Sequence, residues 1–269
     1  MGGSRSDAEG RITTEVRDSL FLIGFDRVEK RNGFTPAMYD ALSEALTRLD
    51  EDDSLHVGVL FGHGDHTTAG LDLPRWTERL ADPGAGTPGA VTSTGVDPVG
   101  LGRRCRKPIV TAVQGITFTF GIELMLAGDV VVAADDCRFS QLEPRRGIMA
   151  TGGATMRFVE RGGWGNAMYH LLIDEEFDAH EARRCGLVQE VVPAGTQLDR
   201  AIELATVIAQ RAPLAIQATK SSSRLYAEEG ERACIDALAS TQARLMKTED
   251  AREGVASFRE KRPAVFHGR

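Results

Sequence analysis

The sequence lacks the features that mark membrane-spanning, disulfide-rich and nucleic-acid-binding proteins. No apolar run approaches the roughly 18–20 residues that cross a bilayer. The four cysteines lie far apart without a C-x-x-C spacing, which argues against a zinc site or a disulfide framework and favours the reducing cytoplasm. The net charge of −7 provides no general excess of cations for nucleic acid. These absences predict a cytoplasmic protein without metal, nucleic acid or membrane as partner, and they still allow an anionic small ligand.

The composition supports a folded core, since 42% of the 269 residues are hydrophobic. Residues 1–11 are polar, rich in Gly and Ser and without the apolar stretch of a signal peptide, so we predict a disordered leader there. Strand patterns then alternate with helix patterns up to Val192, and only helix patterns follow. Local signals within this order predict a hairpin turn at Asp18-Ser19, a helix N-cap at Thr35, a helix break at residues 161–165 and a strand over residues 187–192. We therefore predict an α/β core domain over residues 12–195 and a C-terminal helical region over residues 196–269. The Gly, Pro, Ser and Thr content of residues 81–100 predicts a long loop of the kind that often covers an active site.

The chain is organised around residues 111–153, a stretch that places two acidic residues in apolar surroundings. Glu123 lies in a short apolar helix pattern, and Glu143 follows the next buried strand pattern. A desolvated carboxylate has a raised pKa and is suited to proton transfer. The alternatives are a structural ion pair of Glu123 with Arg103 or Arg157, and for Glu143 a solvated loop position or a charge at the N-terminus of a helix.

Two Gly-containing turns lead from predicted strands into predicted helices, one at Gly70-Leu71-Asp72 and one at Phe120-Gly121. The N–H groups at the start of a helix have no partner within the helix and favour negative charge. Two of them converging on one point would form an oxyanion hole. The alternative is that such turns are common in α/β proteins and have no catalytic part.

Three other patterns are weaker. The sequence GAGTPG at residues 84–89 matches a dinucleotide-binding spacing but follows no predicted strand. His63, Asp65 and His66 offer metal ligands, although a solvated loop explains them better. The basic cluster that includes Arg27 and Lys30 precedes a predicted helix start, where it could bind phosphate.

Four blocks of the chain together resemble the crotonase superfamily, that is, the enoyl-CoA hydratase/isomerase family, from about residue 12 to residue 266. GHGDHTTAGLDL resembles the family's G-x-G-x-x-F-x-A-G-x-D loop, and AVQGITFTFGIELMLAGDVVVAADDCRFSQLE resembles its V-x-G-x-x-x-G-G-G-x-E-L-x-x-x-x-D block with the following strand. GIMATGGATMRF resembles the G-x-x-P-x-x-G-G-x-x-R-L block, and FREKRPAVF is similar to the F-x-E-K-R-x-P-x-F ending. The set is more specific than any one block.

The resemblance implies a crotonase-like α/β fold of repeated ββα units with a C-terminal helical region that supports a homotrimer or a dimer of trimers. It implies an acyl-CoA thioester substrate, so that coenzyme A is part of the substrate and no separate cofactor is needed. By motif position, Leu71 and Phe120 would supply the two N–H groups of the oxyanion hole. Glu123 would chiefly activate water and Glu143 would deliver a proton. The implied substrate-binding positions are Ala69, Gly70, Asp72 and Gly121, with Arg27, Lys30 and Lys261 at the nucleotide end of coenzyme A, the last from a neighbouring subunit.

The sequence departs from the family pattern at the oxyanion-hole turn, where the glycine triplet is replaced by Thr119, Phe120 and Gly121. We expect the phenyl group of Phe120 to crowd or redirect the acyl chain. Three hypotheses stay open: an enoyl-CoA hydratase, favoured because both glutamates are present; an isomerase or another enzyme of CoA-enolate chemistry; and a non-catalytic acyl-CoA binder whose pocket Phe120 blocks.

Overall fold

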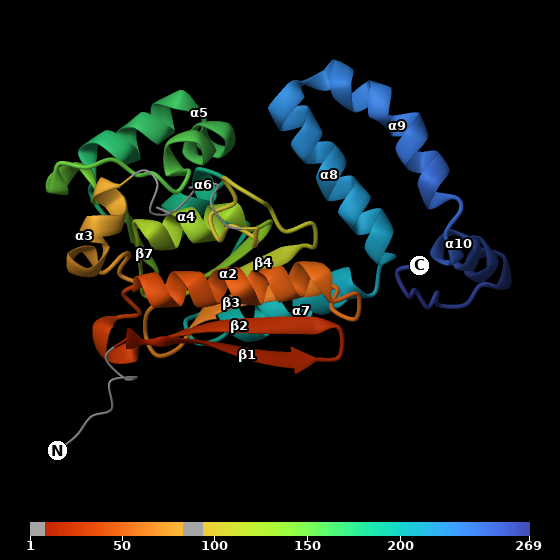
Figure 1. Cartoon of the computed structure of the whole chain (residues 1–269), viewed down its shortest axis with the longest axis horizontal. Coiled ribbons are helices and arrows are strands. Elements are labelled where there is room, and N and C mark those ends of the chain that lie inside the picture. Colours follow the sequence, from red (N-terminus) through yellow and green to blue (C-terminus); the bar gives the residue numbers. More distant parts are fainter. Residues whose placement is uncertain (1–8, 83–93) are drawn as a thin grey trace.

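The computed structural model describes residues 9–82 and 94–269 (Figure 1). Most of the predicted leader and the predicted lid loop fall on residues 1–8 and 83–93, outside the described residues, as does the GAGTPG sequence. The first strand begins at Arg11. The chain forms a mixed α/β core followed by a helical arm, which confirms the predicted fold class.

The larger sheet has the strand order β1-β2-β3-β4-β6-β9. The antiparallel hairpin of the first two strands turns at Asp18, which has φ 52°, where the sequence predicts a turn. All other neighbours in this sheet are parallel. The strands are β1 Arg11–Arg17, β2 Leu20–Asp26, β3 Val57–Gly62, β4 Ile109–Val113, β6 Val130–Ala134 and β9 Glu190–Val192.

The central strands are buried on both faces because helices cover each side of the sheet. In β2, Leu20 and Leu22 pack on the side of α7, Gln197–Ala209, whereas the alternate residues Phe21 and Ile23 pack on the side of α2, Pro36–Glu51. Parallel strands covered in this way have continuous apolar sequences rather than alternating ones. The helix α2 begins where the sequence predicts, with Thr35 as N-cap accepting from the Met38 N–H.

A smaller sheet has the strand order β5-β7-β8 and carries the segments that lead to Glu123 and Glu143. Its strands are β5 Ile116–Phe118, β7 Arg138–Ser140 and β8 Phe177–Asp178. The helices around it are α3 Leu73–Ala81, α4 Phe120–Ala127, α5 Ala154–Ile173 and α6 Ala179–Arg184. Because β5 leads directly into α4 and β7 leads towards Glu143, this sheet brings the two acidic segments to the same end of the molecule.

The last three helices stand apart from the sheets as an arm (Figure 1). They are α8 Pro213–Glu229, α9 Glu231–Leu245 and α10 Glu249–Glu260. The helix α7 precedes them and packs on the sheet through Ala201 and Ala205. The predicted boundary after residue 195 therefore comes one helix before the point where the chain leaves the core.

Two predicted boundaries change in the structure. The helix break predicted at residues 161–165 is a kink inside α5, at Gly163 with φ 74° and ψ 164°. The strand predicted at residues 187–192 is confined to β9, because the N–H of Leu187 donates to Ala182 O at 2.9 Å in the turn that ends α6. Leu187 is buried, as its apolar side chain indicates. An apolar residue does not show whether the buried backbone is a strand or a packed turn, so the sequence predicted a strand that is too long.

Candidate active site

Two segments distant in sequence run side by side at the predicted oxyanion hole. Thr68 and Thr117 form a parallel bridge, in which Thr68 N donates to Ile116 O and Phe118 N donates to Thr68 O, each at 3.1 Å. Leu71 and Phe120 each lie three residues beyond this bridge. The backbone pairing thus brings together the two turns that the sequence singled out.

The N–H groups of Leu71 and Phe120 are both left unpaired by this arrangement. Leu71 forms a parallel bridge with Phe34, in which Phe34 N donates to Gly70 O and Asp72 N donates to Phe34 O, each at 2.9 Å. The N–H of Leu71 therefore points to the opposite side. Phe120 is the first residue of α4 and has no acceptor within the helix. Within the described part of the chain, neither N–H has a hydrogen-bond partner. Two free N–H donors on adjacent segments are what an oxyanion hole requires.

Thr119 adopts a backbone conformation that normally requires glycine, with φ 49° and ψ −113°. Its hydroxyl lies against Gly70, which has φ 101° and leaves no space for a Cβ. The change from glycine to threonine at residue 119 therefore depends on a glycine at residue 70. A β-branched residue held in this region stores strain of about 1–3 kcal/mol, and such strain persists mainly at functional sites.

The Phe120 ring turns into the core, contrary to the expectation that it crowds the pocket. It is 1% exposed and packs edge-on against Phe34, with ring centroids 4.9 Å apart, and beside Tyr39 at 5.8 Å. The residue lines the cavity, and its ring packs in the aromatic core. Blockage of the pocket by this ring is therefore excluded.

Glu123 is buried in the first turn of α4, and backbone donors fix its carboxylate. Its Oε1 atom accepts from Gly152 N at 2.6 Å and from Ala154 N at 3.3 Å. Burial raises the pKa of Glu123, while these two N–H groups and the charge of Arg157 act in the opposite direction. The residue is held in one orientation by groups that favour its ionised form.

Glu143 lies opposite, at the start of the short turn η2, Pro144–Arg146. It is 9% exposed, so the solvated alternative is wrong. Burial raises the pKa of Glu143 to about 7, and the charge of Glu123 adds to the effect. In the orientation that donates, the Gln141 amide lies 2.9 Å from Glu143 Oε2. The two carboxyl groups are therefore close enough to influence each other's protonation.

A cavity of about 610 Å³ joins these features. Both glutamates and both predicted oxyanion-hole residues line it, as do the predicted substrate positions Ala69 and Asp72. Sequence reasoning missed the apolar and polar side chains that complete the wall, namely Leu73, Pro74, Leu80, Leu142, Arg146, Ile148, Met149 and Thr151. Five of these eight lie within eight residues of Glu143, so proximity in sequence was the available signal.

A comparison with family models assigns the sequence to a known family. Residues 15–269 match the model described as enoyl-CoA hydratase/isomerase. The chain belongs to the enoyl-CoA hydratase/isomerase family. This confirms the resemblance drawn from the four sequence blocks.

Relatives and solved structures of the enoyl-CoA hydratase/isomerase family match almost the whole chain. An enoyl-CoA hydratase of Mycobacterium tuberculosis is 30% identical, covering 95% of this chain and 96% of its own. The 2,3-dehydroadipyl-CoA hydratase of Escherichia coli is 32% identical, covering 93% and 96%. The crystal structure of a probable enoyl-CoA hydratase/isomerase from Mycobacterium abscessus has a TM-score of 0.91 at 42% identity, covering 96% and 98%.

Other positions carried over from the family pattern lie elsewhere. Arg27 is 4% exposed, and its Nη1 donates to Gly33 O and pairs with Asp72 Oδ2, both at 2.8 Å. The phosphate contact expected for Arg27 therefore does not follow from the structure, because its guanidinium is used inside the protein. Lys30 is exposed beside that loop, and Lys261 is exposed at the end of α10, so their contacts with coenzyme A stay predictions.

Gly70 and Gly121 act through the backbone. Gly70 O accepts from Phe34 N at 2.9 Å, and Gly121 packs directly against Thr68, where a Cβ would lie 2.6 Å from the Thr68 methyl group. These glycines allow the two segments of the predicted oxyanion hole to approach each other, which is a positioning role.

The structure also decides the alternatives for the charged and metal-ligating residues. Arg103 pairs with Asp50 at 2.9 Å, and the described residues contain no ion pair between Glu123 and an arginine. His63 Nε2 lies 2.8 Å from Thr13 Oγ1, and His66 Nδ1 accepts from Ile116 N at 3.2 Å. The two histidines thus support the loop through hydrogen bonds.

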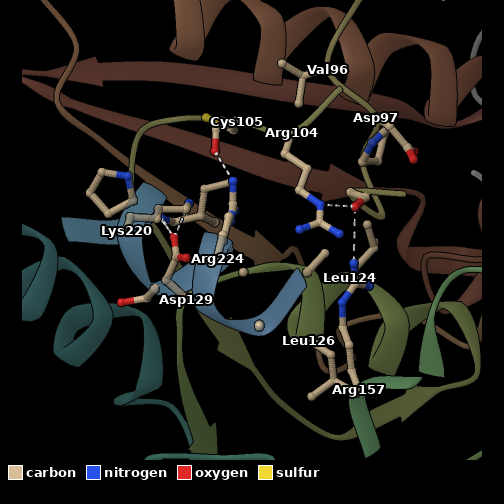
Figure 2. Close-up of a pocket in the computed structure, with 18 of the residues that line it drawn as sticks. Val96, Asp97, Arg104, Cys105, Leu124, Leu126, Asp129, Arg157, Lys220 and Arg224 are labelled. Atoms are coloured by element: carbon tan, nitrogen blue, oxygen red, sulfur yellow. Dashed lines mark hydrogen bonds and ion pairs between the residues drawn. The ribbon is translucent and has the colours of Figure 1, made fainter. Parts of the chain in front are cut away.

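Arg157 lines a second cavity and also contacts Gly152, the residue whose N–H holds Glu123. This second cavity, of about 520 Å³, lies between α4, α5 and α8 and contains Arg157, Lys220 and Asp129 (Figure 2). Arg157 Nη2 donates to Val99 O at 2.7 Å, and Nη1 donates to Gly152 O at 3.1 Å. Because Gly152 N holds Glu123, the arginine supports the residue whose N–H orients the carboxylate. None of the four predicted catalytic residues lines the second cavity.

No described helix combines the length and apolarity needed to cross a membrane. The cytoplasmic location stays a prediction.

Proposed function

We propose that this chain adds water across the 2,3 double bond of a 2-enoyl-CoA thioester. The observation that carries the proposal is the convergence on one cavity of two buried carboxyl groups, Glu123 and Glu143, and two unpaired N–H groups, those of Leu71 and Phe120. Relatives named for the hydration of CoA thioesters support hydration as the reaction. Coenzyme A would enter as part of the substrate.

The chemistry requires charge stabilisation at one atom and two proton transfers. A water oxygen bonds to the β-carbon as Glu123 takes one of its protons, and the π electrons move onto the thioester oxygen. The N–H groups of Leu71 and Phe120 stabilise that enolate oxygen; loss of one such donor typically costs about 2.7–4 kcal/mol in the transition state. The enolate then takes a proton from Glu143 at the α-carbon, so that H and OH are added overall.

The environments of the two carboxyl groups support this division of roles. Burial raises the pKa of Glu123, and the two backbone N–H groups that hold its carboxylate oppose that rise, which suits Glu123 to take a proton as the base. Glu143 has a pKa near 7, so a large fraction is protonated at neutral pH and suited to act as an acid. Two neighbouring buried carboxyls share a proton more readily than they both ionise. The proton that Glu123 accepts must return to Glu143 before the next turnover.

The direct test is turnover of 2-enoyl-CoA thioesters by the wild type and by Glu123→Gln and Glu143→Gln. The amides keep the shape of the carboxyls but cannot exchange the proton, so we expect near-complete loss of hydration in both. Mass spectrometry distinguishes a product heavier by one water from an isomer of unchanged mass. Turnover at the wild-type rate in either variant would refute the mechanism, and isomerisation alone would identify the alternative CoA-enolate chemistry.

We further propose that the arm of α8–α10 packs on a second copy of the chain, as expected for a trimer or a dimer of trimers. Large apolar side chains are exposed along it, including Tyr226 at 60%, Leu238 at 52% and Phe258 at 86%. Surfaces of this kind commonly mark protein–protein contacts. Sedimentation equilibrium would give the oligomeric state, and Phe258→Asp should shift it towards the monomer; a monomeric wild type would refute this proposal.

A further inference from the structure

Arg146 is the one cation among the described residues that line the active-site cavity. It is exposed, and within the described part of the chain its guanidinium makes no hydrogen bond or ion pair. Its neighbour Arg145 behaves differently, since Arg145 Nε pairs with Asp174 Oδ1 at 2.5 Å. Asp72, on the same cavity, is already paired with Arg27 at 2.8 Å. Arg146 is therefore a charge at the cavity without a counterion.

The local backbone holds Arg146 close to the reacting groups. Its N–H donates to Glu143 O at 2.9 Å, and Ile148 N donates to the same oxygen at 3.2 Å. Gly147, in the left-handed region with φ 71°, ends the turn. This short closed turn places the base of the arginine side chain at a defined point beside the acidic residue.

The surrounding wall is mostly apolar. Leu80, Ile148 and Met149 line the same cavity, and the last two are 43% and 63% exposed. Apolar exposed side chains suit an acyl chain, whereas a guanidinium among them suits an anionic oxygen group. Arginine binds carboxylates through two parallel N–H···O bonds, which are about twice as strong as neutral hydrogen bonds.

We propose that the acyl chain of the substrate ends in a carboxylate and that Arg146 binds it. This inference rests on the proposed function of the cavity and names the class of thioester that it accepts, the 2-enoyl-CoA derivatives of dicarboxylic acids. The phosphates of coenzyme A offer the same anionic oxygen chemistry. The acyl end is favoured because Arg146 shares a cavity and a backbone turn with Glu143, which acts on the acyl group.

The test compares pairs of 2-enoyl-CoA thioesters of equal chain length, one ending in a methyl group and one in a carboxylate. For the wild type we expect kcat/KM to be about 10–100-fold higher for the carboxylate member at the best length. Arg146→Gln should remove that preference, so that kcat/KM falls about 10–100-fold more for the carboxylate-ended member of a pair than for the methyl-ended one. Arg145→Gln, in the same turn but paired with Asp174, is the matched control and should keep the preference.

Each other outcome has a distinct meaning. An equal loss on both members of a pair would assign Arg146 to the phosphates of coenzyme A and overturn the proposal, as would a wild type that favours the methyl ending. Calorimetric binding of the saturated, unreactive thioesters supplies a readout that does not depend on turnover. If the wild type hydrates nothing yet binds the carboxylate-ended analogue about 10–100-fold more tightly through Arg146, the proposed function fails and the inference stands.

Discussion

Glu143→Gln should stabilise the protein at alkaline pH while abolishing its activity. The folded state raises the pKa of Glu143 to about 7 from the ordinary value of 4.5, first through burial and then through the charge of Glu123. The folded state therefore binds this proton more tightly than the unfolded state does. Its contribution to stability is fully present below about pH 4.5 and is lost as the pH rises through 7.

The size of the effect follows from the gap between the two pKa values. At ~1.4 kcal/mol per pH unit, ionisation of Glu143 lowers the free energy of unfolding by about 3 kcal/mol at pH 8 and by less than about 1 kcal/mol at pH 5. Glutamine resembles the protonated carboxyl and cannot ionise, so the variant should regain that amount at pH 8. For a chain of this size, this corresponds to a rise in Tm of about 2–4 °C per kcal/mol.

The measurement is urea denaturation of both proteins at pH 5 and pH 8, followed by circular dichroism. Glu44→Gln on the exposed side of α2 is the matched control and should change little at either pH. A gain of equal size at both pH values would assign the effect to packing rather than to ionisation. No gain at pH 8 would refute the burial of an ionisable Glu143 and, with it, the acid role.

Three further variants examine the groups around the two glutamates. Thr119→Gly should relieve the strain of a backbone held at φ 49°. Glycine also makes the unfolded chain more flexible, so the expected net gain in the free energy of unfolding is about 1 kcal/mol. A loss of stability would show that Thr119 is unstrained. Gly152→Ala would place a methyl group against the Glu123 carboxylate and should lower kcat/KM at least about tenfold, whereas Gly165→Ala, where there is open space, should not; equal effects would contradict the geometry. Arg157→Gln removes a positive charge that lowers the pKa of Glu123, so the acidic limb of the pH–rate profile should move to higher pH; an unmoved limb would remove Arg157 from the positioning of that carboxylate.

The order of strands and helices and the family could be predicted from the sequence, because both depend on local patterns of residues. The apolar run of β4 and the N-cap of α2 at Thr35 depend on residues near in sequence. The four motif blocks likewise need only the order of residues, and the family model confirms them. The pairing of Glu123 with Glu143 as the two acids of one site came from the same blocks.

Side-chain direction was not predictable, because it depends on contacts between distant segments. The Phe120 ring turns towards Phe34 and Tyr39 because an aromatic cluster receives it, and no local pattern shows that space. Arg27 is withdrawn from solvent by Asp72, a partner 45 residues away. The same limit applied to Arg146, whose position at the cavity becomes apparent only when the wall is assembled.

The amino-acid sequence by itself therefore determined the order of strands and helices, the family and the acidic residues, since hydrophobic period, capping and motif spacing act over short distances. Tertiary structure alone decided, for the described residues that line the cavity, which backbone N–H groups are left unpaired, how far burial raises the pKa of Glu143, and which cation lacks a counterion. Those properties arise from desolvation and from the approach of segments far apart in the chain.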